Sequence, residues 1–327
     1  MAPIWRHRFA TALPRECLAN AGTPPDRASR RFCVVLALPE GTYPTASLLR
    51  AQELSRGLGA GLHVVRVVPQ LSAANALFLR RSLSPARQSH AARTVERTLS
   101  AHRATRAWLA DSLADARELE QVALLQGNFD SEVATYARGV RARLVIVASR
   151  ARRMGRTVVS LVESCKVPVL VARELRTRDA IVAATDLQSP DYPVLRAAAE
   201  LVACLDARLV AVHNVNPISI LVGSGVGWPA VTVLPADRTR AARAVRLAKA
   251  TERLAVAATA VVRDELSAAE AILDEAELHD ADLVVVGTRH RGWLDQLLGA
   301  SVAAQVVNRA RRSVLVTPID EPPASAI

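Results

Sequence analysis

Short apolar runs of strand length alternate with longer amphipathic stretches along most of the chain, and the alternation occurs twice. Runs with apolar residues at nearly every position are typical of parallel strands buried on both faces. The first series lies at 30–39, 61–69, 120–127, 143–149 and 167–173, and the second at 178–186, 207–217, 258–265, 282–288 and 312–318. The pattern predicts an α/β chain made of two tandem copies of one unit, each with a five-stranded, mostly parallel open sheet.

The stretches between these runs have helical periodicity, so helices should cover both faces of each sheet. In the stretch 189–206, Ser189 is a good N-cap and Pro190 suits the first helical position. The expected helices lie at 45–59, 87–118, 129–142, 189–206, 239–256 and 267–281, with a closing helix before the last strand of each copy.

The segment ELRTRD, residues 174–179, is charged and lacks core residues, so the linker between the copies is expected there. The predicted organisation is a disordered tail over 1–30, a first domain over 31–176, a second domain over 177–320 and a short tail over 321–327. The loop 217–235 is long, apolar and contains Trp228, which suggests a lid or a partner surface.

The composition argues against a membrane protein, a secreted protein and a cysteine-based metal site. No apolar run approaches the roughly 18 residues that a membrane span needs, and the first 30 residues lack the apolar segment of a secretory signal. The four cysteines are scattered, with no CxxC motif and no His partner at metal-binding spacing, which indicates buried thiols in a reducing cytoplasm. The sequence shows no nucleophile–base pair. We therefore predict no catalytic residue and no metal site, and we predict that the protein is not an enzyme.

The net charge of +11 is uneven along the chain. Residues 1–178 hold 28 Lys and Arg against 13 Asp and Glu, whereas residues 179–327 hold 14 against 18. A basic half can attract nucleic acid, but its arginines are not interleaved with aromatic residues as single-strand binding requires. We therefore expect a solvated arginine-rich surface and disfavour nucleic acid as the partner.

Ligands of open parallel sheets bind beyond the carboxyl ends of the strands, where the strand order reverses. The loops after the first and fourth strands of each copy are therefore the places to look. In the second copy, Asp186 ends the first strand, and the segment GTRHRGWLDQLLGAS, residues 287–301, follows the apolar part of the fourth strand.

The segment ADLVVVGT, a glycine-bearing loop, the helix SVAAQVV and the strand RSVLVTP follow one another in an order that resembles the universal stress protein family. The resemblance covers about 31–173 and 179–319, so the chain looks like a tandem member. It implies the nucleotide-binding fold of the adenine nucleotide alpha hydrolases, a cytoplasmic stress-response role without significant turnover, and domains that pair with each other. It leaves open a homodimer as a further assembly.

The nucleotide-binding members of that family carry Gly, two residues, Gly, nine residues, Gly, and then Ser or Thr. Gly287 and Ser301 match this pattern, whereas His290 and Ala300 replace the second and third glycines. By this resemblance the candidate residues for binding ATP are Asp186, Gly287, Thr288, Arg289, His290, Arg291, Ala300, Ser301 and Val302.

Two interpretations of this loop stay open. A non-glycine residue such as His290 in a left-handed conformation costs about 1–2 kcal/mol, but the cationic side chains of Arg289, His290 and Arg291 could replace lost backbone contacts to phosphate. Alternatively, the loop is a solvated basic turn in an interaction module that binds no nucleotide. Asp186 either accepts a hydrogen bond from a ribose hydroxyl or an adenine amino group, or it caps the following helix. His213 is best interpreted as a packed polar residue.

The first copy has lost more of the pattern. Ala148 stands where the first glycine belongs, the loop is shorter, and Gly155 and Thr157 are interpreted as remnants of the terminal Gly–Ser/Thr pair. We expect no ATP binding there and predict that this copy is the intramolecular partner of the second. An adenylating enzyme of related fold is disfavoured, because TDLQSPD stands where such enzymes carry a Ser-Gly-Gly-x-Asp-Ser loop.

Overall fold

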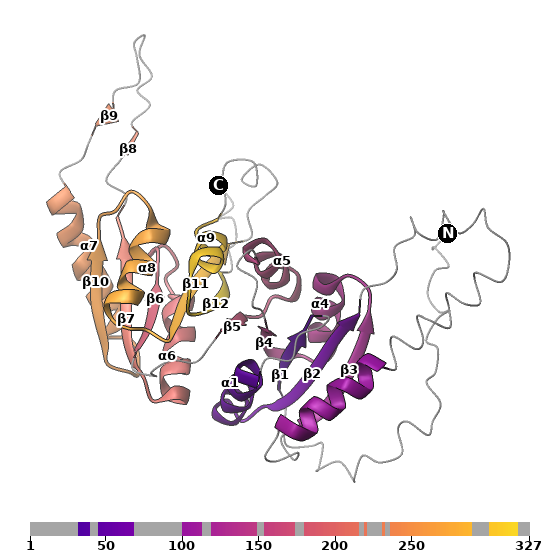
Figure 1. Ribbon diagram of the computed structural model, residues 1–327. Coiled ribbons are helices and arrows are strands. Elements are labelled where there is room, and N and C mark those ends of the chain that lie inside the picture. Colours follow the sequence, from indigo (N-terminus) through magenta and orange to yellow (C-terminus); the bar gives the residue numbers. More distant parts are fainter. Residues whose placement is uncertain are drawn as a thin grey trace, which may run out of the picture.

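One ten-stranded sheet runs through the computed structural model, which describes residues 32–39, 45–68, 100–112, 119–148, 154–173, 180–215, 219–220, 231–232, 236–289 and 301–319 (Figure 1). The strand order is β10-β7-β6-β11-β12-β5-β4-β1-β2-β3. All neighbours in this sheet are parallel except β12 and β5, which are antiparallel. Each half of the chain thus contributes five parallel strands, as the repeat predicts.

The strands lie close to the apolar runs. Those of the first half are β1 (Cys33–Leu38), β2 (Gly61–Val68), β3 (Leu119–Gln126), β4 (Ala142–Ala148) and β5 (Val169–Ala172). Those of the second half are β6 (Ala180–Ala184), β7 (Arg208–Asn214), β10 (Ala258–Arg263), β11 (Leu283–Arg289) and β12 (Ser313–Ile319). Every residue of β1 and β2 is buried, whereas the edge strands β3 and β10 are partly exposed, as expected for a sheet covered on both faces.

Helices form a layer on each face of the sheet. They are α1 (Thr45–Gly57), α4 (Phe129–Gly139), α5 (Gly155–Cys165), α6 (Pro193–Leu205), α7 (Ala236–Thr251), α8 (Ala268–Leu278) and α9 (Val302–Arg309), and residues 100–112 are also helical. One core cluster joins α4, α5, α8 and α9 to the sheet, and the other joins α1, α6, α7 and the helix at 100–112 to the opposite face. Both clusters contain residues of both halves, so the hydrophobic core is continuous across the chain.

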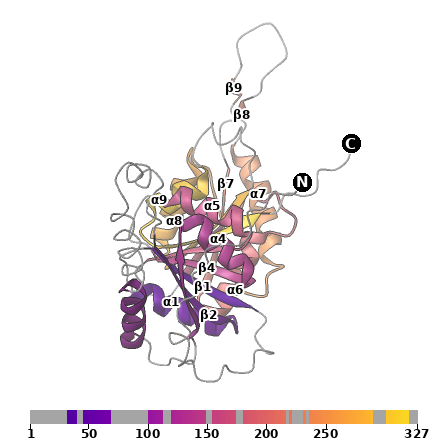
Figure 2. The ribbon, with the colours of Figure 1, turned by 90° about the vertical axis from the view of Figure 1, so that its right-hand side faces the viewer.

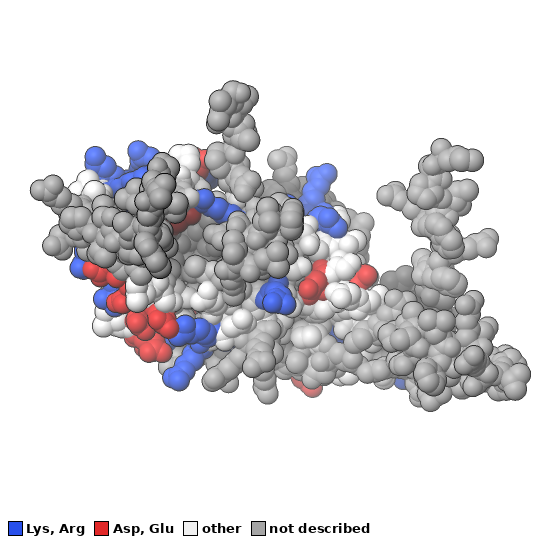
Figure 3. Space-filling model, turned by 90° about the horizontal axis from the view of Figure 1, so that it is seen from above, with Lys and Arg blue, Asp and Glu red and all other residues white. Residues whose placement is uncertain are grey.

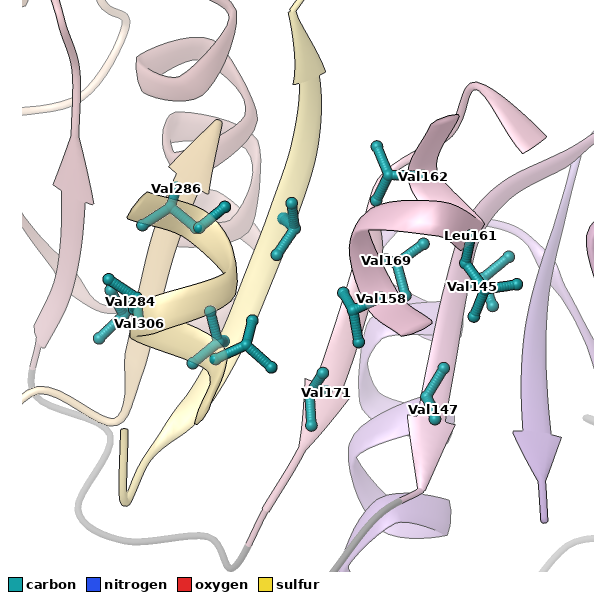
Figure 4. Close-up of a cluster of buried hydrophobic side chains, with 14 of the residues drawn as sticks. Val145, Val147, Val158, Leu161, Val162, Val169, Val171, Val284, Val286 and Val306 are labelled. Carbon is teal, nitrogen blue, oxygen red and sulfur yellow. The ribbon is translucent and has the colours of Figure 1, made fainter. Parts of the chain in front are cut away.

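The halves meet where β5 and β12 pair in antiparallel register, with Leu170 opposite Leu315. Above this junction α5 packs on α9, and the labelled valines of β4, β5 and β11 lie beneath the two helices (Figure 4). The sequence-based expectation that the two copies pair with each other agrees with this arrangement. The contact joins one edge strand of each copy and so leaves neither of these two edges unpaired.

Polar contacts also cross between the halves. The Asn308 side chain in α9 accepts a hydrogen bond from the Gly155 backbone N–H at 2.8 Å, and so caps α5, which has no cap from its own side chain. Arg173 donates through Nη2 to the Val307 carbonyl at 2.6 Å. Each of these contacts satisfies a backbone group at a helix end that has no partner within its own helix.

Some predicted boundaries are wrong. Helix α6 begins at Pro193, after Tyr192 in a left-handed conformation, and not at Ser189. The segment from Ser189 to Tyr192 forms a turn in which the Tyr192 N–H donates to the Ser189 carbonyl. Two prolines suit a first helical position, and the second, Pro193, takes it. Helix α7 ends at Thr251, earlier than expected.

Several predictions fall outside the described residues. Among them are the tails 1–30 and 321–327, the linker 174–179, Trp228, and the part of the predicted helix 87–118 that lies before residue 100 or after 112. Of the long loop 217–235, the structure describes β8 (Ser219–Ile220) and β9 (Val231–Thr232), an antiparallel pair that projects away from the main sheet in two perpendicular views (Figure 1 and Figure 2).

Candidate functional site

The carboxyl ends of β6 and β11 lie together, because these two parallel strands are neighbours in the sheet. Strand β7 flanks β6 on its other side, so the strand order reverses at β6. Loops that leave the sheet at such a point diverge to opposite faces and open a crevice. We call this place the β6–β11 mouth and define it by Thr185, Asp186 and Gln188 after β6 and Arg289 at the end of β11.

Side chains from both strands meet in this mouth. Arg289 donates through Nη2 to Asp186 Oδ2 at 2.6 Å and through Nη1 to Gln188 Oε1 at 2.6 Å. The other carboxylate oxygen, Asp186 Oδ1, accepts from the Gln188 backbone N–H at 2.9 Å. Both oxygens of Asp186 are therefore engaged, and the carboxylate does not cap α6 as one sequence interpretation proposed.

The Arg289–Asp186 pair is partly exposed to solvent. The side chain of Arg289 is 27% exposed and that of Asp186 is 41% exposed. The Nε atom of Arg289 is buried and has no hydrogen-bond partner among the described residues. The pair is therefore partly solvated and does not belong to the hydrophobic core.

His213, near the end of β7, contacts the β6–β11 mouth through Thr185 and is 6% exposed. Its Nδ1 donates to the Thr185 carbonyl at 2.7 Å, which fixes the proton on that nitrogen in the neutral ring. Burial lowers the pKa of His213, the bond to Thr185 and the charge of Asp186 oppose this, and the cations Arg243 and Arg246 lower the pKa further. The residue is a packed polar side chain, as the sequence favoured.

Gly287 lies inside β11 and serves packing. A Cβ at this position would come within 2.3 Å of Ile319 Cδ1 and 2.8 Å of Val194 Cγ2. The backbone there has no positive φ, so conformational freedom is not what requires glycine. Thr288, the next residue, is buried and pairs in register with Pro318.

Ser301 is the N-cap of α9. Its Oγ accepts from the Ala304 backbone N–H at 3.1 Å, and Val302 begins the helix with a partly exposed side chain. The hydroxyl proton of a capping serine stays available for donation, because the cap uses only an oxygen lone pair. Three further candidates, His290, Arg291 and Ala300, lie outside the described residues.

In the first half, Gly155 opens α5 and contacts α9 directly. A Cβ on Gly155 would come within 2.3 Å of the Ala304 carbonyl oxygen, so its lack of a side chain serves the contact between the halves. This contact accounts for the glycine at position 155, and it does so without a phosphate loop. Ala148, in the position of the missing first glycine, is the buried last residue of β4.

Sequence reasoning missed Gln188, Arg243 and Arg246 as parts of this region. The signal for Gln188 is its position two residues after Asp186, the spacing at which an Asp side chain accepts from a backbone N–H. The signal for Arg243 and Arg246 is their three-residue spacing on α7, which puts both on one helix face. On the face of the molecule that Figure 3 shows, the described basic and acidic side chains are interspersed.

The described ranges contain no cluster of three His, Cys, Asp or Glu side chains able to hold a metal ion. None of the helices within these ranges combines the length and the apolar character that a membrane crossing requires.

Solved structures that are similar to this chain share its fold. A universal stress protein from Archaeoglobus fulgidus DSM 4304 matches with a TM-score of 0.56 and 13% identity over 88% of this chain and 97% of its own. A Pseudomonas aeruginosa UCBPP-PA14 protein assigned to the universal stress proteins matches with a TM-score of 0.56 and 15% identity over 88% of this chain and 93% of its own. No curated protein sequence matches the chain significantly.

The model of the universal stress protein family matches the chain twice, at residues 33–173 and 177–318. These two ranges cover the two sets of five strands that make up the sheet, apart from the last residue of β12. The chain therefore belongs to the universal stress protein family and carries two of its domains in tandem.

Proposed function

We propose that the second domain, 177–320, binds an adenine nucleotide at the β6–β11 mouth, and that the protein acts by binding and conformational response in a cytoplasmic stress response. The observation that carries the proposal is the meeting of Asp186 and Arg289 at 2.6 Å where the strand order reverses. Such a pair offers acceptors for sugar hydroxyls and donors for phosphate oxygens in one place.

The residues present fit such a ligand. Asp186 would accept from ribose hydroxyls, Arg289 would donate to phosphate, and the Ser301 hydroxyl would add a donor at the N-terminus of α9. Unpaired N–H groups at a helix N-terminus favour anions, and the nearby cations Arg243 and Arg246 raise the local concentration of anionic ligands. Gly287 and Thr288 support the loop in this proposal, and His290, Arg291, Ala300 and Val302 are its remaining candidates.

We expect no significant turnover. In the described part of the mouth, Asp186 is engaged by Arg289, and His213 is held by a backbone carbonyl on one ring nitrogen. A general base has to be within reach of the proton that it removes and free to take it, and neither group meets both requirements here.

We infer that the first domain, 31–176, binds no nucleotide in this manner and serves as the partner of the second domain. Ala148 is buried at the end of β4, and Gly155 is in contact with Ala304. A second copy of the chain remains a further partner in this proposal, whereas nucleic acid is not part of it.

Equilibrium titration with ATP and AMP tests the proposal. We expect saturable binding to the wild type, weakened about tenfold or more in Ser301→Ala and in Asp186→Ala, since each change removes a polar contact of about 1.5–3 kcal/mol when the partner is charged. Asn128→Ala is the matched control, because Asn128 caps α4 in the first half by accepting from the Asp130 N–H at 3.0 Å.

A second candidate function is an interaction module that binds no nucleotide. The engagement of both Asp186 oxygens within the protein favours it. Absence of binding to the wild type at millimolar ATP and AMP would support this candidate and refute the first.

A further inference from the structure

In the β6–β11 mouth, the charged side chains of Asp186 and Arg289 form an ion pair with each other. In the glycine pattern of the family, Arg289 stands at one of the two unspecified positions after the first glycine, so that pattern does not require an arginine there. In the structure its guanidinium spans from β11 to the turn after β6 and takes two acceptors there, Asp186 and Gln188. A ligand that needs Asp186 has to displace this guanidinium.

We propose that the Arg289–Asp186 pair is a specificity filter: it admits ligands that carry both hydroxyl donors and a phosphate, and it disfavours ligands that carry only one of these. The inference rests on the proposed nucleotide function, and it makes Arg289 the residue that distinguishes a nucleotide from a nucleoside or from free phosphate. Asp186 and Arg289 contact the ligand, and Gln188 holds the arginine in the ligand-free state.

The filter follows from the exchange of partners. A nucleoside brings hydroxyl donors that can satisfy Asp186, but it leaves the released guanidinium without an anion. Free phosphate can take the guanidinium, but it leaves the Asp186 carboxylate beside a second anion. A nucleotide brings a donor for Asp186 and an anion for Arg289, so both charged groups exchange one charge-assisted hydrogen bond for another.

The surroundings of the pair set the strength of the effect. Both side chains are partly exposed, so solvent screens the pair and the filter discriminates by a modest factor. The charges of Arg243 and Arg246 act on every anionic ligand whatever residue stands at 289, so some preference for phosphate remains when Arg289 is replaced. The discriminating quantity is therefore the ratio of the two affinities, nucleotide over nucleoside.

The test measures dissociation constants of AMP, adenosine and inorganic phosphate by calorimetry for the wild type, Arg289→Gln and Asp186→Asn. We expect the wild type to prefer AMP over adenosine, and Arg289→Gln to bind adenosine more tightly than the wild type does, because Asp186 is released. The ratio of affinities should fall by about tenfold, the change that 1.4 kcal/mol produces. In Asp186→Asn, whose arginine has lost its anionic partner, inorganic phosphate should bind more tightly than to the wild type.

Arg312→Gln is the matched control. Arg312 pairs with Asp280 at 2.8 Å. Arg312 immediately precedes β12 and Asp280 lies shortly before β11, at the end of the sheet opposite the mouth. Its variant loses an arginine ion pair of the same domain, and we expect it to leave all three affinities unchanged. Thermal unfolding of each variant shows that the compared proteins are folded.

The possible results separate the filter from the proposed function. If Arg289→Gln weakens AMP and adenosine by the same factor, so that the ratio of their affinities is unchanged, the filter is refuted although nucleotide binding stands. If the wild type binds neither ligand but Arg289→Gln gains adenosine binding, the ion pair blocks Asp186 without admitting a nucleotide, and both the filter and nucleotide binding by the wild type are refuted. Absence of binding in every variant refutes both.

Discussion

At the residue scale, the β6–β11 mouth brings together side chains that are distant in the sequence. The end of an apolar run indicates Asp186, and the spacing of the loop indicates Ser301. In the structure Asp186 follows β6, and Ser301 is the N-cap of α9. The ion pair that engages Asp186 joins residues 103 apart in the sequence. No local pattern encodes such a contact, because it depends on the order of the strands in the sheet.

Gly287 illustrates the same limit, since the family pattern suggests a ligand contact and the structure shows tight packing. We predict that Gly287→Ala destabilises the protein by about 1–3 kcal/mol, because the methyl group would overlap Ile319 and Val194. The measurement is chemical denaturation. Gly139→Ala is the control: nothing lies within 4 Å of a Cβ there, so this variant should be neutral or slightly more stable. Equal stabilities of the two variants would contradict the packing role.

His213 gives a prediction about pH. Because burial holds its pKa in the folded protein below the usual value of 6.5, the folded state favours the neutral ring. This contribution to stability is present above pH 6.5 and decreases as the pH falls below it, since the unfolded chain takes up the proton more readily. We expect His213→Asn, which keeps a donor for the Thr185 carbonyl, to lose less stability than the wild type between pH 7 and pH 5.

The measurement is denaturant unfolding at several pH values. Its readout is the difference in the free energy of unfolding between the wild type and His213→Asn. His63 and His102 also have lowered pKa values through burial, and their contribution is common to both proteins and cancels in the difference. A difference that stays constant from pH 7 to pH 5 would show that His213 does not carry this dependence.

At the element scale, the repeat of apolar runs and amphipathic stretches predicted the ten main strands and the helices between them, because burial on both faces leaves a strong pattern in the sequence. The helix ends were less predictable. Pro190 and Pro193 both suit the start of α6, and the choice between them depends on the turn that precedes the helix. The long loop pattern at 217–235 could not reveal the pairing of β8 with β9, since each strand has only two residues.

The contact between α5 and α9 allows a test at this scale. We predict that Gly155→Ala destabilises the protein by about 1–3 kcal/mol, because the added Cβ meets the backbone of Ala304, which cannot rotate away as a side chain can. The helices would have to separate, which would also weaken the bond from the Gly155 N–H to Asn308. Denaturant unfolding compared with Gly139→Ala, a glycine of α4, measures the effect. A change no larger than that of the control would show that the contact adapts without strain.

At the scale of the whole molecule, the two domains behave as one packed unit. The sheet continues from β5 into β12, and both core clusters extend across the junction. The sequence indicated the pairing through the tandem repeat, but the polar residues that hold it were not apparent. Arg50 of α1 is 2% exposed and donates to Asp282, which immediately precedes β11 in the other half. A buried arginine requires such a partner.

This buried pair leads to the last prediction. Arg50→Met should destabilise the protein by about 3–5 kcal/mol, because it leaves Asp282 without its arginine in the interior. Arg143→Met breaks another ion pair between the halves, to Glu200 at 2.9 Å, but both of those side chains are exposed, so about 0–1 kcal/mol is expected. Calorimetric unfolding measures both, and the shape of the transition shows whether the halves still unfold together. If the two variants are equally stable, the Arg50–Asp282 pair does not hold the domains together, and the continuous sheet and the apolar contacts of α5, α9, α1 and α6 are sufficient to do so.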